Sequence, residues 1–420
     1  MIEEDRSMPT VALLGTFDTK QAEYRWLRER LVEHGCSVLG VDVGPFSDGA
    51  GLADVTSGEV AAEAGADLGQ LRAQGDRGHA MEVMGDGAAA VVTRLYREGR
   101  LDAVLAVGGS GGSSVAGRVM RALPVGVPKL LVSTMASGDV RPYVGDVDVT
   151  LMYSVVDISG VNSVSEMVLG NAVAAVAGMA AHHGTRRNAP ERGERRPVVA
   201  ASMFGLTTPA VDEARDVLTD LGYEVLVFHA TGSGGRAMES LVASGLVDGV
   251  LDLTTTELAD DLVGGVLTAG PERLEAAGRA GIPQVVSVGA LDMVNFGPRE
   301  TVPERFADRT FLVHNPTVTL MRTTRDEMAT LGRRIADKVA AATGPVEVFL
   351  PLGGVSGIDG PGMRFEDTAA DEACLAEIRA GLAGSSVVVH DVDSHINDKG
   401  FGRAAAEALH RLITTHGGHA

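Results

Sequence analysis

The chain has 420 residues, of which 45% are apolar and only 4% aromatic, so two or three domains can form cores of aliphatic side chains. A formal net charge of −20 argues against a nucleic-acid-binding or membrane-binding protein, because both partners are themselves negative. Two cysteines provide neither a disulfide framework nor a zinc site, and the acidic N-terminal residues do not resemble a signal peptide. We therefore expect a cytoplasmic protein with no metal site of its own, and no stretch of about 20 apolar residues that would span a membrane.

The first elements form a βαβ unit, which is typical of a parallel sheet covered by helices. Its strand, helix and second strand are expected at residues 10–14, 21–34 and 37–43. The turn after the first strand contains Asp18, which together with Gln21 resembles a helix capping box.

The same alternation continues to residue 183. Helices are expected from Thr56, over 80–98, up to Ala122 and over 163–183, and strands over 102–107 and 128–132. Residues 184–197 carry five arginines without periodicity, which predicts a linker between two lobes. The expected domains are an N-terminal Rossmann-like nucleotide-binding lobe (1–183), the linker (184–197) and a C-terminal Rossmann-like lobe (198–420).

The C-terminal lobe repeats the opening pattern. A strand at 199–203, a helix ending at Leu221 and a strand at 224–228 match the first βαβ unit in order. Further βα units begin at Val346 and Ser386. The expected fold class is α/β: two doubly wound Rossmann-like lobes with parallel sheets and a cleft between them.

Ligands of open parallel sheets bind beyond the carboxyl ends of the strands, so the turns there are the candidate sites. In the first lobe, the glycine-rich turn 108–114 offers backbone N–H groups and a helix N-terminus to an anion, although it matches neither a Walker A motif nor G-x-G-x-x-G. The alternative is a tight turn that needs small residues. Lys20 could neutralise phosphate, Asp18 could cap the helix or contact a metal or sugar hydroxyl, and Asp42 could contact a ribose. The expected nucleotide-binding residues are Gly15, Thr16, Asp18, Thr19, Lys20, Asp42, Gly108, Gly109, Ser110, Gly111, Gly112, Ser113, Ser133, Thr134, Ser137 and Gly138.

In the second lobe, residues 229–239 combine a histidine, a glycine-rich anion cradle and an arginine at a strand end. The expected catalytic residues are His229 as a general base, Arg236 as a carboxylate or phosphate ligand, and Glu257. A histidine bonded only for structural reasons is the alternative for His229. We assign the polar clusters at His314–Asn315 and His395–Asp398 to loops.

Eight strings of residues, in this order, resemble the Tm-one-like ATP-binding family. They are GTFDTK, GGSGGSS, PKLLVSTMASG, VVDISGVNSVSEMVLGNA, FHATGSGGRAME, SVGALDMVNFGP, HNPTVTLMRTT and HINDKGF, and the resemblance covers roughly residues 9 to 415. That family includes the N-terminal domain of a plant resistance protein that inhibits tobamovirus RNA replication. The resemblance implies two Rossmann-like lobes, ATP as the bound cofactor, with or without Mg²⁺, and a homodimer.

Three functions follow as expectations. The first is an ATP-binding protein that acts as an enzyme on a small molecule in the cleft between the lobes. The second is a non-catalytic, ATP-dependent sensor or interaction module, favoured by the absence of a recognisable catalytic triad. The third is an ATP-independent enzyme that uses His229 on a small carbonyl or carboxylate substrate.

Overall fold

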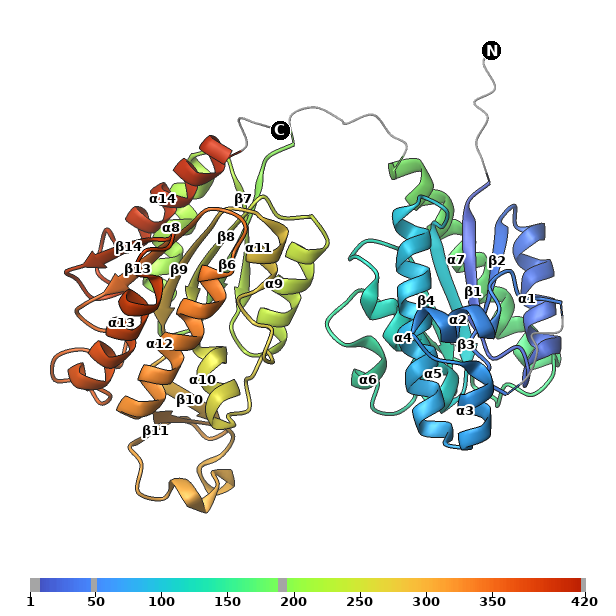
Figure 1. Cartoon of the computed structure of the whole chain (residues 1–420), viewed down its shortest axis with the longest axis horizontal. Helices are drawn as coiled ribbons and strands as arrows, with labels where there is room; N and C mark the ends of the chain where they lie inside the picture. Colours follow the sequence, from blue (N-terminus) through green and yellow to red (C-terminus); the bar gives the residue numbers. More distant parts are fainter. Residues whose placement is uncertain (1–7, 47–50, 188–194, 417–420) are drawn as a thin grey trace, which may run out of the picture. The chain divides into compact units, whose positions relative to one another are not determined.

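The computed structural model describes residues 8–46, 51–187 and 195–416. The chain divides into two compact units, Met1–Gly193 and Glu194–Ala420, each with its own sheet and its own helices (Figure 1).

The first unit is a five-stranded parallel sheet in the order β2-β1-β3-β4-β5. Its strands are β1 (Thr10–Gly15), β2 (Ser37–Asp42), β3 (Ala103–Gly108), β4 (Lys129–Ser133) and β5 (Thr150–Tyr153). Its helices are α1 (Gln21–Glu33), α2 (Ser57–Glu63), α3 (Leu68–Gln74), α4 (Arg77–Arg97), α5 (Ser110–Ala122), α6 (Arg141–Val144) and α7 (Ser163–Arg187).

Helices cover both faces of this sheet, which explains why its central strand β3 is apolar and buried at every position. One core joins the sheet to α2, α4 and α5, and the other joins it to α1 and α7. By length and composition alone α7 could cross a membrane, contrary to our expectation from the sequence. Its buried side chains, such as Leu169, Val173 and Val176, pack in the core against the sheet.

The second unit has a six-stranded parallel sheet in the order β14-β13-β9-β8-β6-β7. The strands of the unit are β6 (Val198–Met203), β7 (Glu224–His229), β8 (Gly249–Thr254), β9 (Gln284–Gly289), β10 (Met293–Phe296), β11 (Phe311–Asn315), β12 (Val318–Arg322), β13 (Val346–Pro351) and β14 (Val388–Val392). Its α-helices are α8 (Thr208–Asp220), α9 (Ser233–Ala243), α10 (Thr256–Val263), α11 (Ala276–Ala280), α12 (Arg325–Ala340), α13 (Thr368–Leu382) and α14 (Phe401–His416).

Helices α8 and α14 pack with this sheet in one core. Helices α10, α12 and α13 pack with it in another core, which contains other side chains of the strands. A small antiparallel sheet in the order β10-β12-β11 is added between β9 and α12. The sequence did not predict it, and His314–Asn315, expected in a loop, ends β11.

The expected fold class is confirmed: both units are doubly wound α/β folds with parallel sheets. The internal repeat is also visible in the strand orders, because β7-β6-β8-β9 matches β2-β1-β3-β4. The helix start predicted at Thr56 is confirmed, and Thr56 forms a capping box with Glu59 there. The capping box predicted at Asp18 and Gln21 is wrong, since Lys20 is the N-cap of α1 and no side chain caps it. Helix α7 continues to Arg187, so residues 184–187 of the expected linker are helical.

Candidate functional site

The strand order of the first unit places its switch point between β1 and β3. The chain leaves β1 toward one edge of the sheet through α1 and β2, and leaves β3 toward the other edge through α5 and β4. In doubly wound folds of this order the ligand crevice lies at that point, outside the carboxyl ends of the strands. The turns after Gly15 and Gly108 are therefore the two that flank it.

A tyrosine joins the two strand ends at this switch point. The Tyr24 hydroxyl from α1 donates to the carbonyl oxygens of Leu14 (2.9 Å) and Val107, at the ends of β1 and β3. A Cβ atom on Gly15 would lie 1.8 Å from that hydroxyl, so the glycine is needed for Tyr24 rather than for a ligand. Burial raises the pKa of Tyr24, which keeps the hydroxyl neutral and a donor.

The polar side chains of the turn after β1 are largely bonded within the unit. Thr16 and Thr19 share a hydroxyl–hydroxyl hydrogen bond of 2.9 Å, and the Lys20 ammonium donates to the carbonyl oxygen of Ile158. Asp42 is fully buried and accepts from the backbone N–H of Phe17 (3.2 Å) as well as from that of Gly44. These contacts fix the shape of the turn.

Asp18 is the exception in this turn. Its carboxylate packs on Gly44, where a Cβ atom would lie 2.7 Å from Oδ1. Oδ1 is buried and has no hydrogen-bond partner among the described residues. A single carboxylate oxygen of this kind fits a Mg²⁺ ion that arrives with a nucleotide, because Mg²⁺ is commonly held by one or two carboxylates plus phosphates. Within the described ranges no cluster of three or more His, Cys, Asp or Glu residues could hold a metal by itself.

The turn after β3 leaves the N-terminus of α5 open. Gly109 is the N-cap in an extended conformation, and no side chain caps the helix. By contrast, Thr56, Asp67 and Asp76 each accept a backbone N–H at the starts of α2, α3 and α4. The first N–H groups of an α-helix have no partner within the helix, so those of α5 are available to an external anion.

An arginine lies beside this open end. A Cβ atom on Gly111 would be 3.9 Å from Nη2 of Arg77, the first residue of α4. The Arg77 side chain is exposed and has no hydrogen bond or ion pair with any described residue. Free backbone amides and an unpaired guanidinium are the two kinds of group that bind phosphate most effectively.

The remaining expected ligands of this turn divide into buried and exposed groups. Ser113 and Ser133 are fully buried and bonded to each other (Oγ–Oγ 2.6 Å), which ties the start of α5 to the end of β4. Ser110, Ser137 and Gly138 are exposed, while Thr134, Gly109 and Gly112 are partly exposed. The hydroxyls of Ser113 and Ser133 are therefore used in a structural hydrogen bond, whereas the exposed groups are open to solvent.

In the second unit, the expected anion cradle at the start of α9 is filled by the protein itself. The Glu257 carboxylate accepts from the backbone N–H groups of Gly232 (2.7 Å) and Gly235 (3.0 Å). Arg236 donates to the carbonyl oxygen of Thr268 (2.8 Å), and His229 is exposed at the end of the edge strand β7. The loop therefore binds a carboxylate, as its sequence suggests, but Glu257 of the same chain supplies it.

Glu257 belongs to a buried ionic cluster around Arg273. This fully buried guanidinium donates to Glu257 (2.7 Å), to Asp252 (2.7 Å) and to Glu239 (3.4 Å). Burial alone would lower the pKa of Arg273, but the carboxylates of Asp252 and Glu257 more than reverse that effect and raise it. The cluster joins β8, α9 and α10, which makes it a structural element of the unit.

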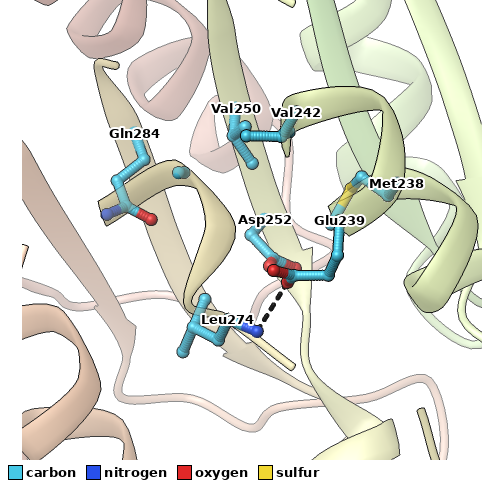
Figure 2. A pocket seen from close by; sticks show the side chains of 8 residues that line it. Met238, Glu239, Val242, Val250, Asp252, Leu274 and Gln284 are labelled. Atoms are coloured by element: carbon cyan, nitrogen blue, oxygen red, sulfur yellow. Dashed lines mark hydrogen bonds between the residues drawn. The ribbon is translucent and has the colours of Figure 1, made fainter. Parts of the chain in front are cut away.

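Figure 2 shows a cavity of about 10 Å³ next to this cluster, lined by Glu239, Asp252 and Gln284 among others. The Glu239 carboxylate accepts the backbone N–H of Leu274 at 2.6 Å across its edge. A space of this size accommodates no more than a water molecule, so it is not a ligand site.

A second buried cluster surrounds Arg322 at the end of β12. Arg322 donates to Asp371 at 2.6 Å and lies 3.7 Å from Asp359, and Ser356 donates to Asp292 at 2.8 Å. Burial, with a smaller contribution from Asp359, raises the pKa of Asp292 to about 8. Burial likewise raises the pKa of Asp371 to about 7.

These raised values predict that stability falls with rising pH. The folded chain keeps protons on Asp292 and Asp371 that the unfolded chain releases near pH 3.8, so each residue destabilises the fold progressively between about pH 4 and its folded pKa. We expect wild-type protein to lose free energy of unfolding between about pH 6 and about pH 8, and Asp292→Asn to lose less. Urea unfolding at both pH values measures this, with the exposed Asp308→Asn as control. Equal pH slopes in wild type and Asp292→Asn would show that Asp292 is ionised in the folded protein.

The sequence did not single out Arg77 or Arg273. Arg77 directly follows the N-cap Asp76, and nothing local distinguishes it from other surface arginines. Arg273 lies in an irregular segment, and its three partners come from elements 16 to 34 residues away in the chain. Only the folded chain brings these groups together.

Family comparisons cover nearly the whole chain. The model of the Uncharacterised protein family (UPF0261) N-terminal domain matches residues 9–185, and that of the UPF0261 C-terminal domain matches residues 196–413. A UPF0261 protein of Clostridium tetani is 47% identical over 96% of this chain and 98% of its own length. A UPF0261 protein of Mesorhizobium japonicum is 42% identical over 96% and 99%.

A plant protein is also similar. The ToMV resistance protein Tm-1(GCR237) of Solanum lycopersicum is 39% identical over 97% of this chain, which spans 56% of that protein. Among solved structures, a C2-type ketoreductase from a modular polyketide synthase aligns with 99% of this chain and 90% of its own, at 16% identity and a TM-score of 0.22, too low to support any argument. The resemblance inferred from the eight strings is therefore confirmed, and the chain belongs to the UPF0261 family, together with the tomato Tm-1 protein.

Proposed function

We propose that the protein binds ATP, with the phosphates at the N-terminus of α5 in the first unit. The observation that carries the proposal is the open start of α5, where Gly109 provides no cap and Arg77 has no ion pair. This end lies at the switch point of the sheet, where doubly wound folds bind nucleotides. The resemblance to the Tm-one-like ATP-binding family favours ATP as the nucleotide.

The net charge of the chain disfavours a nucleic acid but allows a small anion bound by local donors. A net charge of −20 repels nucleic acids at long range, where charges act collectively. Backbone amides and Arg77 act at contact distance, and hydrogen bonds to a charged group contribute about 1.5–3 kcal/mol each. Local donors can therefore hold ATP on an acidic protein.

Asp18 would hold the Mg²⁺ ion that accompanies ATP. Its Oδ1 atom is the buried, unpartnered oxygen in the turn after β1, and Mg²⁺ bound to phosphates typically takes only one or two protein carboxylates. The metal would supply charge neutralisation between the phosphates, while α5 and Arg77 position them.

We do not extend the proposal to chemistry at His229. Glu257, its expected partner, is fully buried and bonded to Arg273 and to the start of α9. Consumption of ATP and mere sensing of ATP both stay open predictions. The homodimer and the cytoplasmic location also stay predictions.

Isothermal titration calorimetry with ATP and MgCl₂ tests the proposal. We expect Arg77→Gln to weaken ATP binding by about tenfold or more, because it removes a charged hydrogen bond to phosphate. Arg97→Gln is the matched control: Arg97 is exposed on the same helix, at the end opposite Arg77, and should leave the affinity unchanged. Absence of any binding heat in wild type, or equal affinities for the two variants, would contradict the proposal.

A further inference from the structure

A second cavity lies in the C-terminal unit, at the carboxyl ends of β13 and β14. Its volume is about 550 Å³, within the range of small-molecule sites. Its polar lining includes Asp393, Ser394, Asn397 and Asp398, and Met363 contributes an apolar wall. The position follows the general rule that ligands of open parallel sheets bind beyond the strand ends.

Hydrogen bonds hold the walls of this cavity in place. His395 Nδ1 accepts the backbone N–H of Asn397 at 3.0 Å, so Nε2 carries the ring proton and donates to the carbonyl oxygens of Ser356 (2.8 Å) and Asp359 (3.0 Å). The Asn397 amide donates to the carbonyl oxygen of Leu206 at 2.9 Å. The histidine therefore joins the loops that follow β13 and β14, and the cavity is largely preformed.

Apart from the Ser394 hydroxyl, which can also donate, the polar side-chain groups left over in the cavity are acceptors. Asn397 Oδ1 is buried and has no hydrogen-bond partner among the described residues. Asp393 is exposed with no ion pair in the described chain, and the Asp398 carboxylate accepts only the backbone N–H of His395, at 2.8 Å. An orphaned buried acceptor beside two unneutralised carboxylates calls for a ligand that donates hydrogen bonds.

An anion is disfavoured in this cavity. No lysine or arginine is part of its lining. The nearby start of α14 is already capped, since the Glu213 carboxylate accepts the backbone N–H groups of Gly400 (2.9 Å) and Arg403 (3.3 Å). The cavity thus has the opposite charge preference to the start of α5 in the first unit.

We infer that this cavity is a second binding site, for a small molecule with a protonated primary amine and neighbouring hydroxyl groups. The ammonium pairs with Asp393 and Asp398, a hydroxyl or ammonium hydrogen bonds to Asn397 Oδ1, and the carbon skeleton contacts Met363. The residues of this site belong to the second unit, whereas the proposed ATP site belongs to the first.

Binding of matched small molecules to the full chain, followed by ligand-observed NMR and calorimetry, tests this inference. The probes form two sets, and within each set the molecules share a carbon skeleton and differ in charge. One set is glucosamine, glucose and glucuronate, and the other is putrescine, butane-1,4-diol and succinate. We expect the amines to bind best, and Asp393→Asn and Asp398→Asn each to weaken their binding by about tenfold. Asp308→Asn, an exposed aspartate of the same unit without a hydrogen bond or ion pair in the described chain, should have no effect.

Met363→Trp provides a variant that does not depend on charge. Met363 is 44% exposed, so tryptophan should fill the cavity without disturbing the core, and amine binding should be lost while the thermal midpoint is unchanged. Absence of amine binding, tighter binding of the carboxylates, or amine binding that all three cavity variants retain would overturn the inference. An ATP titration of the same samples shows whether the nucleotide proposal stands or fails separately.

Discussion

Replacing Arg273 with methionine is expected to lower the free energy of unfolding by about 3–5 kcal/mol, the usual effect of leaving buried charges without their partner. Arg273 is the fully buried cation bonded to Asp252, Glu257 and Glu239. Methionine keeps the apolar stem of the side chain, so most of the loss would come from the uncompensated carboxylates. Burial already raises the pKa of Glu239, and removal of the guanidinium would favour its protonation further.

Urea unfolding of Arg273→Met beside Arg279→Met measures this effect. Arg279 pairs with Glu275 on the surface, where its side chain is 61% exposed, and such pairs contribute about 0–1 kcal/mol. Adding Asp252→Asn to Arg273→Met should recover part of the loss, because one of the unpaired charges is then removed. Equal losses in the Arg273 and Arg279 variants, or no recovery in the double variant, would show that the cluster is not held by its charges.

Replacing Gly109 with aspartate is expected to reduce ATP affinity by about 100-fold or more while leaving the fold as stable as before or slightly more stable. Gly109 is the extended N-cap of α5, a position where aspartate accepts the N–H of the second or third helical residue. The new carboxylate would occupy the amides that we propose for phosphate and would repel it. Glu257 already does the same at the start of α9 in the other unit.

Gly109→Ala is the matched control for this variant. A Cβ atom at Gly109 would lie 3.7 Å from the Thr134 hydroxyl, an ordinary contact, and alanine brings no acceptor to the helix. Its ATP affinity should stay close to that of wild type, and thermal unfolding of both variants reports the effect of the cap. If Gly109→Asp bound ATP as well as Gly109→Ala, the phosphates would have to lie elsewhere.

Local sequence was sufficient for most of the architecture. Apolar runs followed by helical spacing located β1 to β4 of the first parallel sheet and β6, β7, β13 and β14 of the second, and the repeat of this pattern foretold that both units share a strand order. The glycine-rich turn before α9 binds a carboxylate, as its sequence suggested, and the one before α5 leaves the helix without a capping side chain. The strands β10, β11 and β12 were missed because each has only four or five residues and pairs antiparallel within a parallel fold.

The sequence by itself determined the alternation of strands and helices and the places where backbone amides are exposed at helix starts, because these depend on periodicity and on glycine over a few residues. Only the tertiary structure decided which of those amides remain free. Tyr24 occupies the carbonyl oxygens at the ends of β1 and β3, and Glu257 fills the cradle of α9 from 25 residues further along the chain. Arg77 reaches the start of α5 from a different helix. Hydrogen bonds and ion pairs at short range depend on which side chains the packed sheet brings within a few ångströms, and spacing along the chain does not encode that.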